Sequence, residues 1–348
     1  MEYRNLGNTG LRPSVLGFGL WTLSTGWWGE HTDAEAVVLL REARDLGITF
    51  YDASDSYGNG RSEEQLGEAF GNDPDVIVAT KVGYDFYSHA DERRGQREIP
   101  QDFSPAYIRR ACDESLRRLR RDRIDFYQLH NPKMDTIERD ETFACLEDLV
   151  REGKVAAYGV ALGPAIGWEH EGVKAARERK IAGMQIIYNM LEQDPGRAHI
   201  AASRDAGVGV IARVPHSSGM LEGQYTIDTQ FAENDHRRHR PRAWLVDGLK
   251  KVEQLQFLVD ARPAATLGQV ALQWILADPA MTLTLPNIYN SEQLAEFAAA
   301  SDVAPFTPEE LARIQSLYDS NFGLEAADNN AKAKDADALG AQAAGATA

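Results

Sequence analysis

The sequence predicts a single (β/α)8 TIM barrel, an α/β fold in which strands and helices alternate eight times around a parallel sheet. The first observation is that short apolar, β-branched segments alternate with amphipathic segments of helical period. The second is that polar residues directly follow several of these short segments. The third is that no Gly-x-Gly-x-x-Gly stands near the start, where an open doubly wound sheet usually carries one. The predicted strands are residues 15–20, 47–51, 76–80, 124–129, 155–160, 184–188, 208–212 and 281–285.

Length and composition exclude several classes of protein. The chain has 348 residues, which suits one barrel with insertions, and 43% of them are apolar, as in globular proteins. A net charge of −16 argues against a nucleic-acid partner. No apolar run has the length of a membrane span, and the first residues carry no secretory signal. The two cysteines, Cys112 and Cys145, lie in predicted helices, so we expect a reduced, cytoplasmic protein.

The first elements follow from turn and capping signals. Turn residues over 7–10 predict a hairpin within residues 1–13. Apolar residues at helical spacing predict a helix over 33–46. After the second strand, Ser62 is expected to cap the next helix, with Gln65 bonding back to the cap.

The middle of the chain carries a polar insertion, residues 84–103, whose Arg93, Arg94 and Arg97 are expected at the surface. Ser104 and Pro105 then begin a helix. Its buried face is predicted to carry Ile108, Cys112, Leu116 and Leu119. Its opposite face is expected to be solvated and carries Arg110, Arg117, Arg118, Arg120 and Arg121.

The last third contains a long loop and a polar tail. Residues 214–243 follow the seventh strand and include a basic run. His236 and His239 have a spacing that metal sites use, but no third ligand accompanies them, so we predict no metal. The composition of residues 324–348 cannot bury much surface, so we expect a mobile tail after a barrel of residues 1–323.

Four polar residues mark the expected active site. Asp52, Lys81 and His130 come directly after the second, third and fourth strands. Tyr57 lies five residues after Asp52, in a turn marked by Gly58-Asn59-Gly60. Because the C-terminal ends of parallel barrel strands share one rim, we expect these four side chains to converge.

This set suits the reduction of a carbonyl, which requires a hydride donor, a proton donor and dipoles that stabilise the developing alkoxide. Tyr57 is predicted to be the general acid. A Lys81 ammonium about 4 Å away would favour its tyrosinate by roughly 4 kcal/mol at an effective dielectric near 20. Asp52 is expected to keep Lys81 charged and aimed, and His130 to bind the substrate oxygen.

Each of these residues also has a simpler interpretation. Asp52 suits a turn cap, Tyr57 a packing residue, Lys81 a strand-end charge and His130 a satisfied core histidine. Lysines at strand ends also form Schiff bases, so Schiff-base chemistry on Lys81 stays open as an alternative to reduction. Four such residues in one order at successive strand ends favour catalysis over coincidence.

Seven segments together resemble the aldo-keto reductases, in family order, over roughly residues 3 to 320. They are FYDASDSYGNGRSEEQLGEAF, VIVATKVG, RIDFYQLHNP, LVREGKVAAYGV, MQIIYNML, GVGVIARVP and AATLGQVALQWIL. The resemblance implies a (β/α)8 barrel closed at its bottom by the N-terminal hairpin, with an extra C-terminal helix and a nicotinamide cofactor at the C-terminal rim. It also places Asp52, Tyr57, Lys81 and His130 on the family's catalytic tetrad, and Trp21, with Tyr57 and His130, in the substrate pocket.

The resemblance further implies which residues bind the cofactor. Gln185 matches the partner of the nicotinamide carboxamide, and the loop after the seventh strand is implied to cover the pyrophosphate. The implied cofactor residues are Gln185, Arg213, Pro215, Ser217, Gly219, Leu221, Asn287, Tyr289 and Gln293.

This chain departs from the family pattern in three places. Ala161 and Leu162 replace a Ser-Asn pair, and Arg213 replaces a stacking tyrosine. Arg213 could still stack through its guanidinium plane, attract an anion, or form an internal salt bridge. Tyr289, Gln293 and Phe297 stand where basic residues and an asparagine usually bind the 2′-phosphate. The family default is NADP(H), and the missing charges make NAD(H) the alternative.

The expected function is therefore NAD(P)(H)-dependent reduction of an aldehyde, ketone or sugar, or oxidation of the matching alcohol. The alternative is a non-catalytic, cofactor-binding regulatory protein, because the resemblance includes channel-associated members. The sequence leaves open the substrate, the direction of the reaction and the choice between monomer and homo-oligomer.

Overall fold

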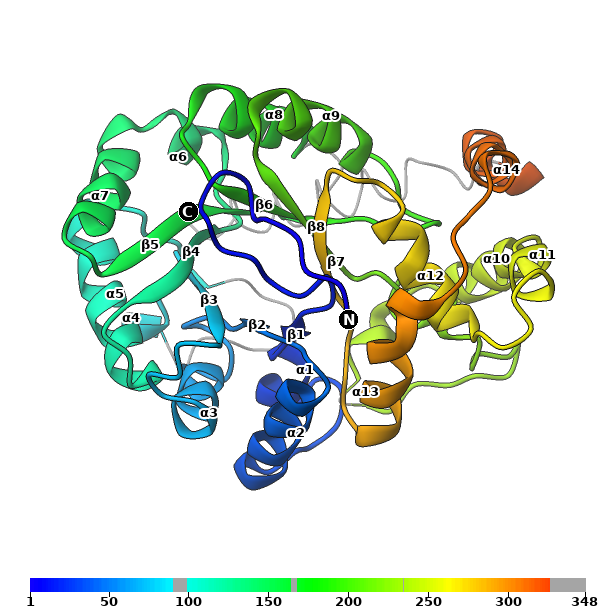
Figure 1. Cartoon of the computed structure of the whole chain (residues 1–348), viewed down its shortest axis with the longest axis horizontal. Helices are drawn as coiled ribbons and strands as arrows, with labels where there is room; N and C mark the ends of the chain where they lie inside the picture. The colour runs from blue at the N-terminus through cyan, green and yellow to red at the C-terminus, as the bar shows by residue number, and fades with distance from the viewer. Residues whose placement is uncertain (90–98, 164–167, 234, 326–348) are drawn as a thin grey trace, which may run out of the picture.

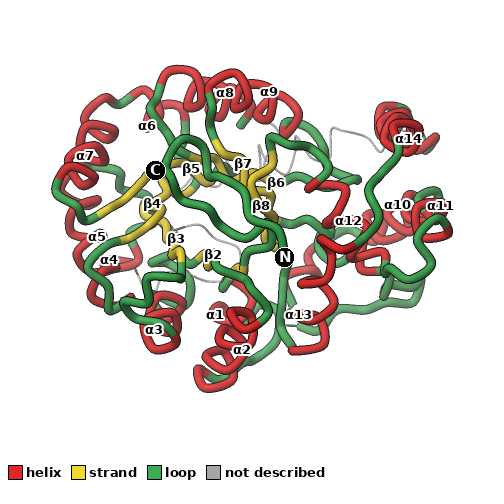
Figure 2. Tube along the Cα trace, viewed as in Figure 1, coloured by secondary structure: helices red, strands yellow, loops and turns green. Residues whose placement is uncertain are grey.

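The structure, a computed structural model, describes residues 1–89, 99–163, 168–233 and 235–325. Its core is a sheet of eight parallel strands in which each strand pairs with the next along the chain. The strands form a nearly closed ring with helices around it (Figures 1 and 2), so the predicted barrel is confirmed. The strands are β1 Phe18–Gly19, β2 Phe50–Asp52, β3 Ile77–Val82, β4 Ile124–His130, β5 Val155–Ala161, β6 Gly183–Ile187, β7 Gly209–Arg213 and β8 Met281–Leu285.

The residues just before β1 close the ring. Leu16 forms an isolated parallel bridge with Thr284 of β8. The Gly17 N–H donates to the Thr284 carbonyl at 2.9 Å, and the Thr284 N–H donates to the Val15 carbonyl at 2.9 Å. A Cβ at Gly17 would lie 2.7 Å from Leu285 Cδ2. A larger residue at this position would therefore displace the Leu285 side chain where the first predicted strand passes β8.

The N-terminal hairpin covers one end of the barrel, as Figure 1 shows. Its two arms are joined by hydrogen bonds from Arg4 N–H to the Pro13 carbonyl at 3.0 Å and from Leu6 N–H to the Leu11 carbonyl at 2.9 Å. Leu6 is fully buried and packs in one cluster with Phe50, inside the ring. The predicted hairpin is confirmed, and Leu6, just before its turn, fills the bottom of the barrel.

Helices lie between successive strands and after β8 (Figure 2). The α-helices are α1 Trp21–Thr25, α2 Asp33–Asp45, α3 Arg61–Ala69, α4 Phe86–His89, α5 Pro105–Leu119, α6 Met134–Glu138, α7 Asp140–Arg151, α8 Glu169–Glu178, α9 Gly196–Ala206, α10 Arg242–Glu253, α11 Gln256–Asp260, α12 Leu267–Leu276, α13 Ser291–Ala298 and α14 Pro308–Asp319. Short 3-10 helices are η2 Met220–Glu222, η3 His236–His239, η4 Ala299–Asp302 and η5 Asn321–Gly323. The extra C-terminal helix is α14, which begins at a capping box of Thr307 and Glu310.

The predicted cap of α3 is wrong. The N-cap residue is Gly60, at φ +96°, and it makes no side-chain cap bond. Ser62 instead donates from Oγ to the Ser54 carbonyl at 2.8 Å. Gln65 donates from Nε2 to Asp33 Oδ1 at 2.8 Å. Gly60, whose backbone is in the left-handed region, starts the helix earlier than predicted. Ser62 therefore connects α3 to the loop after β2, and Gln65 connects it to the start of α2.

The solvated face predicted for α5 is also wrong in two places. Arg118 has a side chain only 5% exposed, and its Nε pairs with Glu63 of α3 at 2.7 Å. Arg121 is 8% exposed and pairs with Asp125 at 3.2 Å. Leu116, expected in the core, is only partly buried. Buried carboxylates on neighbouring elements supply partners that the helical period does not reveal.

The insertion after β3 is less polar than predicted at its ends. Tyr84, Phe86 and Ile99 are buried and form one apolar cluster. Arg93, Arg94 and Arg97 lie outside the described residues, and so does the tail from residue 326 onward. Within the described ranges, none of the helices combines the length and apolar character needed to cross a membrane.

Candidate active site

A buried ion pair joins the ends of β2 and β3. Lys81 donates from Nζ to Asp52 Oδ2 at 2.5 Å and to the Ala53 carbonyl at 2.7 Å. The two side chains are 1% and 5% exposed. Burial by itself lowers the pKa of Lys81, but the interactions with Asp52 and with Tyr57 together outweigh it and the pKa is raised. Lys81 is therefore held as an ammonium ion.

Two glutamines hold the other oxygen of the same carboxylate. Asp52 Oδ1 accepts from Gln128 Nε2 at 2.9 Å and from Gln185 Nε2 at 3.0 Å. Gln185 Nε2 also lies 3.2 Å from Gln128 Oε1, so its donors are used within this network. The sequence prediction missed Gln128. In β4, Gln128 lies two residues from Phe126 and two residues from His130, so all three side chains point to the same face of the strand. This period of two is the signal that places Gln128 inside the barrel.

Tyr57 lies against this ion pair. Lys81 Nζ is 4.6 Å from the centre of the Tyr57 ring, and the His130 ring meets the same phenol edge-on at 5.7 Å. The turn that carries Tyr57 requires glycine at position 58, because a Cβ there would lie 2.4 Å from the Ser24 carbonyl. The four residues expected to converge are thus brought together.

His130 is fixed at the end of β4. Its Nδ1 lies 3.2 Å from Ser54 Oγ, and its ring packs edge-on against Tyr84 at 4.9 Å. Gln101, from the end of the insertion, donates from Nε2 to the His130 carbonyl at 2.9 Å. The insertion therefore helps to build the site.

Asp52, Tyr57 and His130 of the tetrad line one cavity of about 380 Å³, whereas Lys81 lies behind its lining. It is lined by Gly19, Trp21, Trp27, Trp28, Asp52, Tyr57, Tyr84, Ile99, His130, Asn131, Gln185, Ile187, Glu192, Arg213, Val214, Ser218, His236, Arg240, Leu285, Pro286 and Asn287. Trp21 begins α1. The centre of its ring lies 5.9 Å from the ring centres of both Trp27 and Trp28, and 5.5 Å from that of His236. One side of the cavity is therefore aromatic, and the tetrad side is polar.

The implied cofactor residues divide into two groups. Gln185, Arg213 and Asn287 line the cavity. The other six are absent from its lining, and they are Pro215, Ser217, Gly219, Leu221, Tyr289 and Gln293. Ser217 is buried and donates from Oγ to Glu192 Oε2 at 3.1 Å, and Leu221 is fully buried.

Two guanidinium groups face the cavity without a carboxylate. Arg213 donates from Nη2 to the Leu162 carbonyl at 2.8 Å, and burial lowers its pKa. Arg240 donates from Nη2 to Ser218 Oγ at 3.2 Å. Neither forms an ion pair with any residue in the described part of the chain. Guanidinium groups that have no carboxylate partner in the protein suit an anionic ligand such as a diphosphate.

The loop between these arginines has an unusual backbone. Val214, Ser217 and Ser218 have φ of +55°, +48° and +58°. A β-branched residue in the left-handed region is strained by about 1–3 kcal/mol, and such strain concentrates at functional sites. Val214 and Ser218 both line the cavity.

A carboxylate that the sequence prediction missed lies beside the β8–α13 loop. Glu222 Oε2 accepts from the Tyr289 hydroxyl at 3.3 Å and from Gln293 Nε2 at 3.4 Å. Its other oxygen is 3.5 Å from His216 Nδ1, and the side chain is 6% exposed. Two of the three residues expected near a 2′-phosphate, Tyr289 and Gln293, therefore contact a negative charge.

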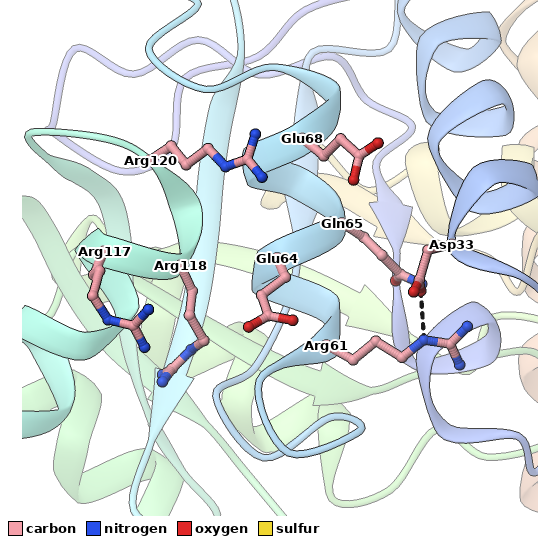
Figure 3. Close-up of a pocket in the computed structure, with 8 residues that line it drawn as sticks. All are labelled: Asp33, Arg61, Glu64, Gln65, Glu68, Arg117, Arg118 and Arg120. Atoms are coloured by element: carbon pink, nitrogen blue, oxygen red, sulfur yellow. Dashed lines mark hydrogen bonds and ion pairs between the residues drawn. The ribbon is translucent and has the colours of Figure 1, made fainter.

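A second pocket of about 240 Å³ lies on the outside of the barrel, between α3 and α5 (Figure 3). It is lined by Asp33, Arg61, Glu64, Gln65, Glu68, Arg117, Arg118 and Arg120. Asp33 and Arg61 form an ion pair at 2.6 Å across it. No tetrad residue lines this pocket, and its mixed charges hold the two helices to their neighbours.

Known proteins share this fold and sequence. The profile of the Aldo/keto reductase family matches residues 15–319. Aldo-keto reductase YhdN of Bacillus subtilis (strain 168) is 28% identical over 314 residues, covering 88% of this chain and 90% of its own. The holo form of an aldo-keto reductase from Bacillus halodurans has a TM-score of 0.73 at 29% identity, covering 91% of this chain and 96% of its own. The glycerol dehydrogenase of Gluconobacter oxydans has a TM-score of 0.76 at 25% identity, covering 91% and 94%. The chain therefore belongs to the aldo/keto reductase family, whose enzymes are oxidoreductases that act on carbonyls and alcohols with nicotinamide cofactors.

Proposed function

We propose that this protein transfers hydride between a nicotinamide cofactor and a small carbonyl or alcohol substrate, with Tyr57 as general acid. The observation that carries the proposal is the position of Tyr57, with the ammonium of Lys81 4.6 Å from its ring and the His130 ring at 5.7 Å. Both aromatic residues line one cavity.

The chemistry follows from these contacts. A bound reduced nicotinamide supplies the hydride that reaches the carbonyl carbon. Tyr57 gives its phenolic proton to the carbonyl oxygen, and Lys81 stabilises the resulting tyrosinate. At an effective dielectric near 20, a unit charge about 4 Å away is worth roughly 4 kcal/mol. Asp52 keeps Lys81 aimed, and His130 orients the carbonyl by a hydrogen bond.

The residues around the cavity fit such a cofactor. Arg213 and Arg240 offer guanidinium donors that suit a pyrophosphate. Gln185 keeps its side-chain oxygen for the carboxamide, although its donors serve Asp52 and Gln128. The Leu162 carbonyl is already used by Arg213, in the region where the family's Ser-Asn pair is missing.

We further propose that the cofactor is NAD(H) rather than NADP(H). Glu222 lies against Tyr289 and Gln293, so a 2′-phosphate there would meet a carboxylate. A ribose 2′-hydroxyl can instead donate to such a carboxylate, as in other NAD sites. The sequence left the choice between the two cofactors open, and this contact favours NAD(H).

The substrate class is proposed from the cavity and from relatives. The similar protein from Gluconobacter oxydans is a glycerol dehydrogenase, which acts on a small polyol. The cavity of about 380 Å³ combines an aromatic side with the polar tetrad, which suits a small carbonyl compound or sugar.

The test compares wild-type protein with Tyr57→Phe on a panel of aldehydes, ketones and polyols with NADH and NADPH. We expect turnover in wild type, and a loss of about 10²- to 10⁴-fold in the variant with nearly unchanged cofactor affinity. Equal turnover in the variant would remove Tyr57 from its role. Tight cofactor binding with no turnover across the panel would instead support the non-catalytic alternative.

A further inference from the structure

The histidine of the tetrad contacts a serine that has several neighbours. Ser54 lies on the loop after β2 and is fully buried. Its Oγ lies 3.2 Å from His130 Nδ1, 3.3 Å from Asp55 Oδ1 and 3.0 Å from Ser56 Oγ. A hydroxyl has only one hydrogen to donate. The atom that receives this hydrogen decides which nitrogen of His130 carries the imidazole proton.

Asp55 determines that choice, and its surroundings are unfavourable for a charge. The side chain is fully buried, and Oδ2 has no hydrogen-bond partner among the described residues. Burial, then repulsion by Glu63, raises the pKa of Asp55 well above its usual range, and the opposing effects of Arg118 and of hydrogen bonds with Ser54 and Ser56 are smaller. A carboxyl group in such a place binds a proton.

The neighbouring carboxylate, Glu63, takes up the cation that could otherwise pair with Asp55. Glu63 accepts from Arg118 Nε at 2.7 Å and from Thr80 Oγ1 at 2.5 Å. Arg118, on α5, is the guanidinium drawn beside the second pocket in Figure 3, and it also donates to the Tyr87 hydroxyl at 2.8 Å. Two buried carboxyl groups thus share one cation, and Glu63 holds it.

Besides His130, which Asp55 reaches through Ser54, three phenols lie near Asp55. Asp55 acts electrostatically on Tyr87 of α4, Tyr107 of α5 and Tyr127 of β4. Burial raises the pKa of all three, so they are neutral at ordinary pH. The charges that face Asp55 are therefore those of Glu63 and Arg118.

We propose that Asp55 is a neutral acid that fixes the tautomer of His130 through Ser54. The Asp55 O–H donates to Ser54 Oγ, the Ser54 O–H donates to His130 Nδ1, and the imidazole proton then resides on Nε2. This rests on the proposed function, because an Nε2–H is the group that donates to a carbonyl oxygen in the cavity. Ser54 and Asp55 are positioning residues in this scheme.

The opposite arrangement would give different chemistry. An ionised Asp55 would accept the Ser54 hydrogen, and His130 would then donate from Nδ1 to Ser54. Nε2 would present a lone pair, which repels a carbonyl oxygen. The two arrangements place the proton on different nitrogens, so they can be told apart without any substrate.

The experiment is a long-range ¹H–¹⁵N correlation spectrum of ¹⁵N-histidine protein near neutral pH, without cofactor. The His130 signals are assigned by their loss in His130→Gln. We expect an Nε2–H tautomer in wild type. We expect a mixture or the Nδ1–H tautomer in Ser54→Ala and in Asp55→Ala. The matched control is Ser115→Ala, because Ser115 is a buried serine of α5 whose Oγ has no partner in the described structure.

An Nδ1–H tautomer in wild type, or an unchanged tautomer in Ser54→Ala, would overturn the proposal. If Asp55→Ala does not fold, Ser54→Ala decides the question alone. Turnover of Ser54→Ala should fall about tenfold with unchanged cofactor affinity, as for one lost hydrogen bond. The spectrum does not depend on turnover. An inactive protein with the Nε2–H tautomer would therefore count against the proposed function only.

Discussion

Gln128 donates a hydrogen bond from Nε2 to Asp52 Oδ1 at 2.9 Å, so the carboxylate that aims Lys81 is itself held from β4. Both side chains are buried, at 0% and 4% exposure. A carboxylate that accepts hydrogen bonds from two fixed amide donors cannot rotate away from the ammonium. The position of Lys81 beside Tyr57 thus depends on a residue of β4, two strands away from Asp52.

The first prediction concerns this support. Gln128→Leu removes a donor to Asp52 and keeps a similar volume, so Asp52 and Lys81 should become less well aimed. We expect turnover to fall about tenfold, the value of roughly one hydrogen bond to a charged group, with unchanged cofactor affinity. Steady-state kinetics and cofactor titration measure the two effects. Gln315→Leu, on the outside of α14, is the control, and a similar loss there would contradict the specific role.

The second prediction concerns Lys81. Lys81→Met removes the ammonium beside Tyr57, so turnover should fall about 10³-fold, corresponding to roughly 4 kcal/mol. The pKa of Lys81 is raised in the folded protein above its ordinary value of 10.5. The ion pair therefore contributes stability that is fully present below pH 10.5. This stability is lost as the pH rises through the raised pKa that Lys81 has in the folded protein.

Thermal melting between pH 8 and 11 measures this second effect. Wild type should lose stability at the alkaline end more steeply than Lys81→Met combined with Asp52→Asn. Parallel curves for the two proteins would contradict the assigned charge on Lys81. The double variant is used because Lys81→Met alone leaves a buried carboxylate unpaired.

The third prediction concerns the cofactor. Glu222→Gln keeps the contacts to Tyr289 and Gln293 but removes the charge, so NADPH affinity should rise relative to NADH. We expect the affinity ratio to change about tenfold or more, because like charges in contact cost at least 1.4 kcal/mol. Quenching of tryptophan fluorescence reports binding, since three tryptophans line the cavity. Glu233→Gln, whose carboxylate is 94% exposed, is the control. Tighter NADPH binding by wild type would contradict the assignment.

The fourth prediction concerns stability. Arg118→Met leaves Glu63 buried without its cation, which should reduce the free energy of unfolding by about 3–5 kcal/mol. Adding Glu63→Gln should recover part of this loss, because the uncompensated charge is then removed. Urea denaturation measures both. Arg117→Ala, with a side chain 66% exposed, should change stability by less than about 0.5 kcal/mol. A loss as large in the control would contradict the buried-pair argument.

The sequence alone determined the order of the elements and the rim on which the tetrad lies. Strand positions follow from local apolar runs, and all eight predicted strands correspond to observed ones, with ends shifted by a few residues. Asp52, Lys81 and His130 come together because parallel strands present their C-terminal ends at one rim. Such features depend on local period and chain direction, which a sequence carries directly.

Only the tertiary structure decided which side chains become partners. Gln128 and Asp52 are 76 residues apart, Gln185 and Asp52 133, and Arg118 and Glu63 55. Glu222 reaches Tyr289 across 67 residues. These contacts arise where separate elements pack, and a helical or strand period shows only that a polar residue faces inward. The burial that raises the pKa of Asp55 comes from all the surrounding elements at once, so no local pattern could predict it.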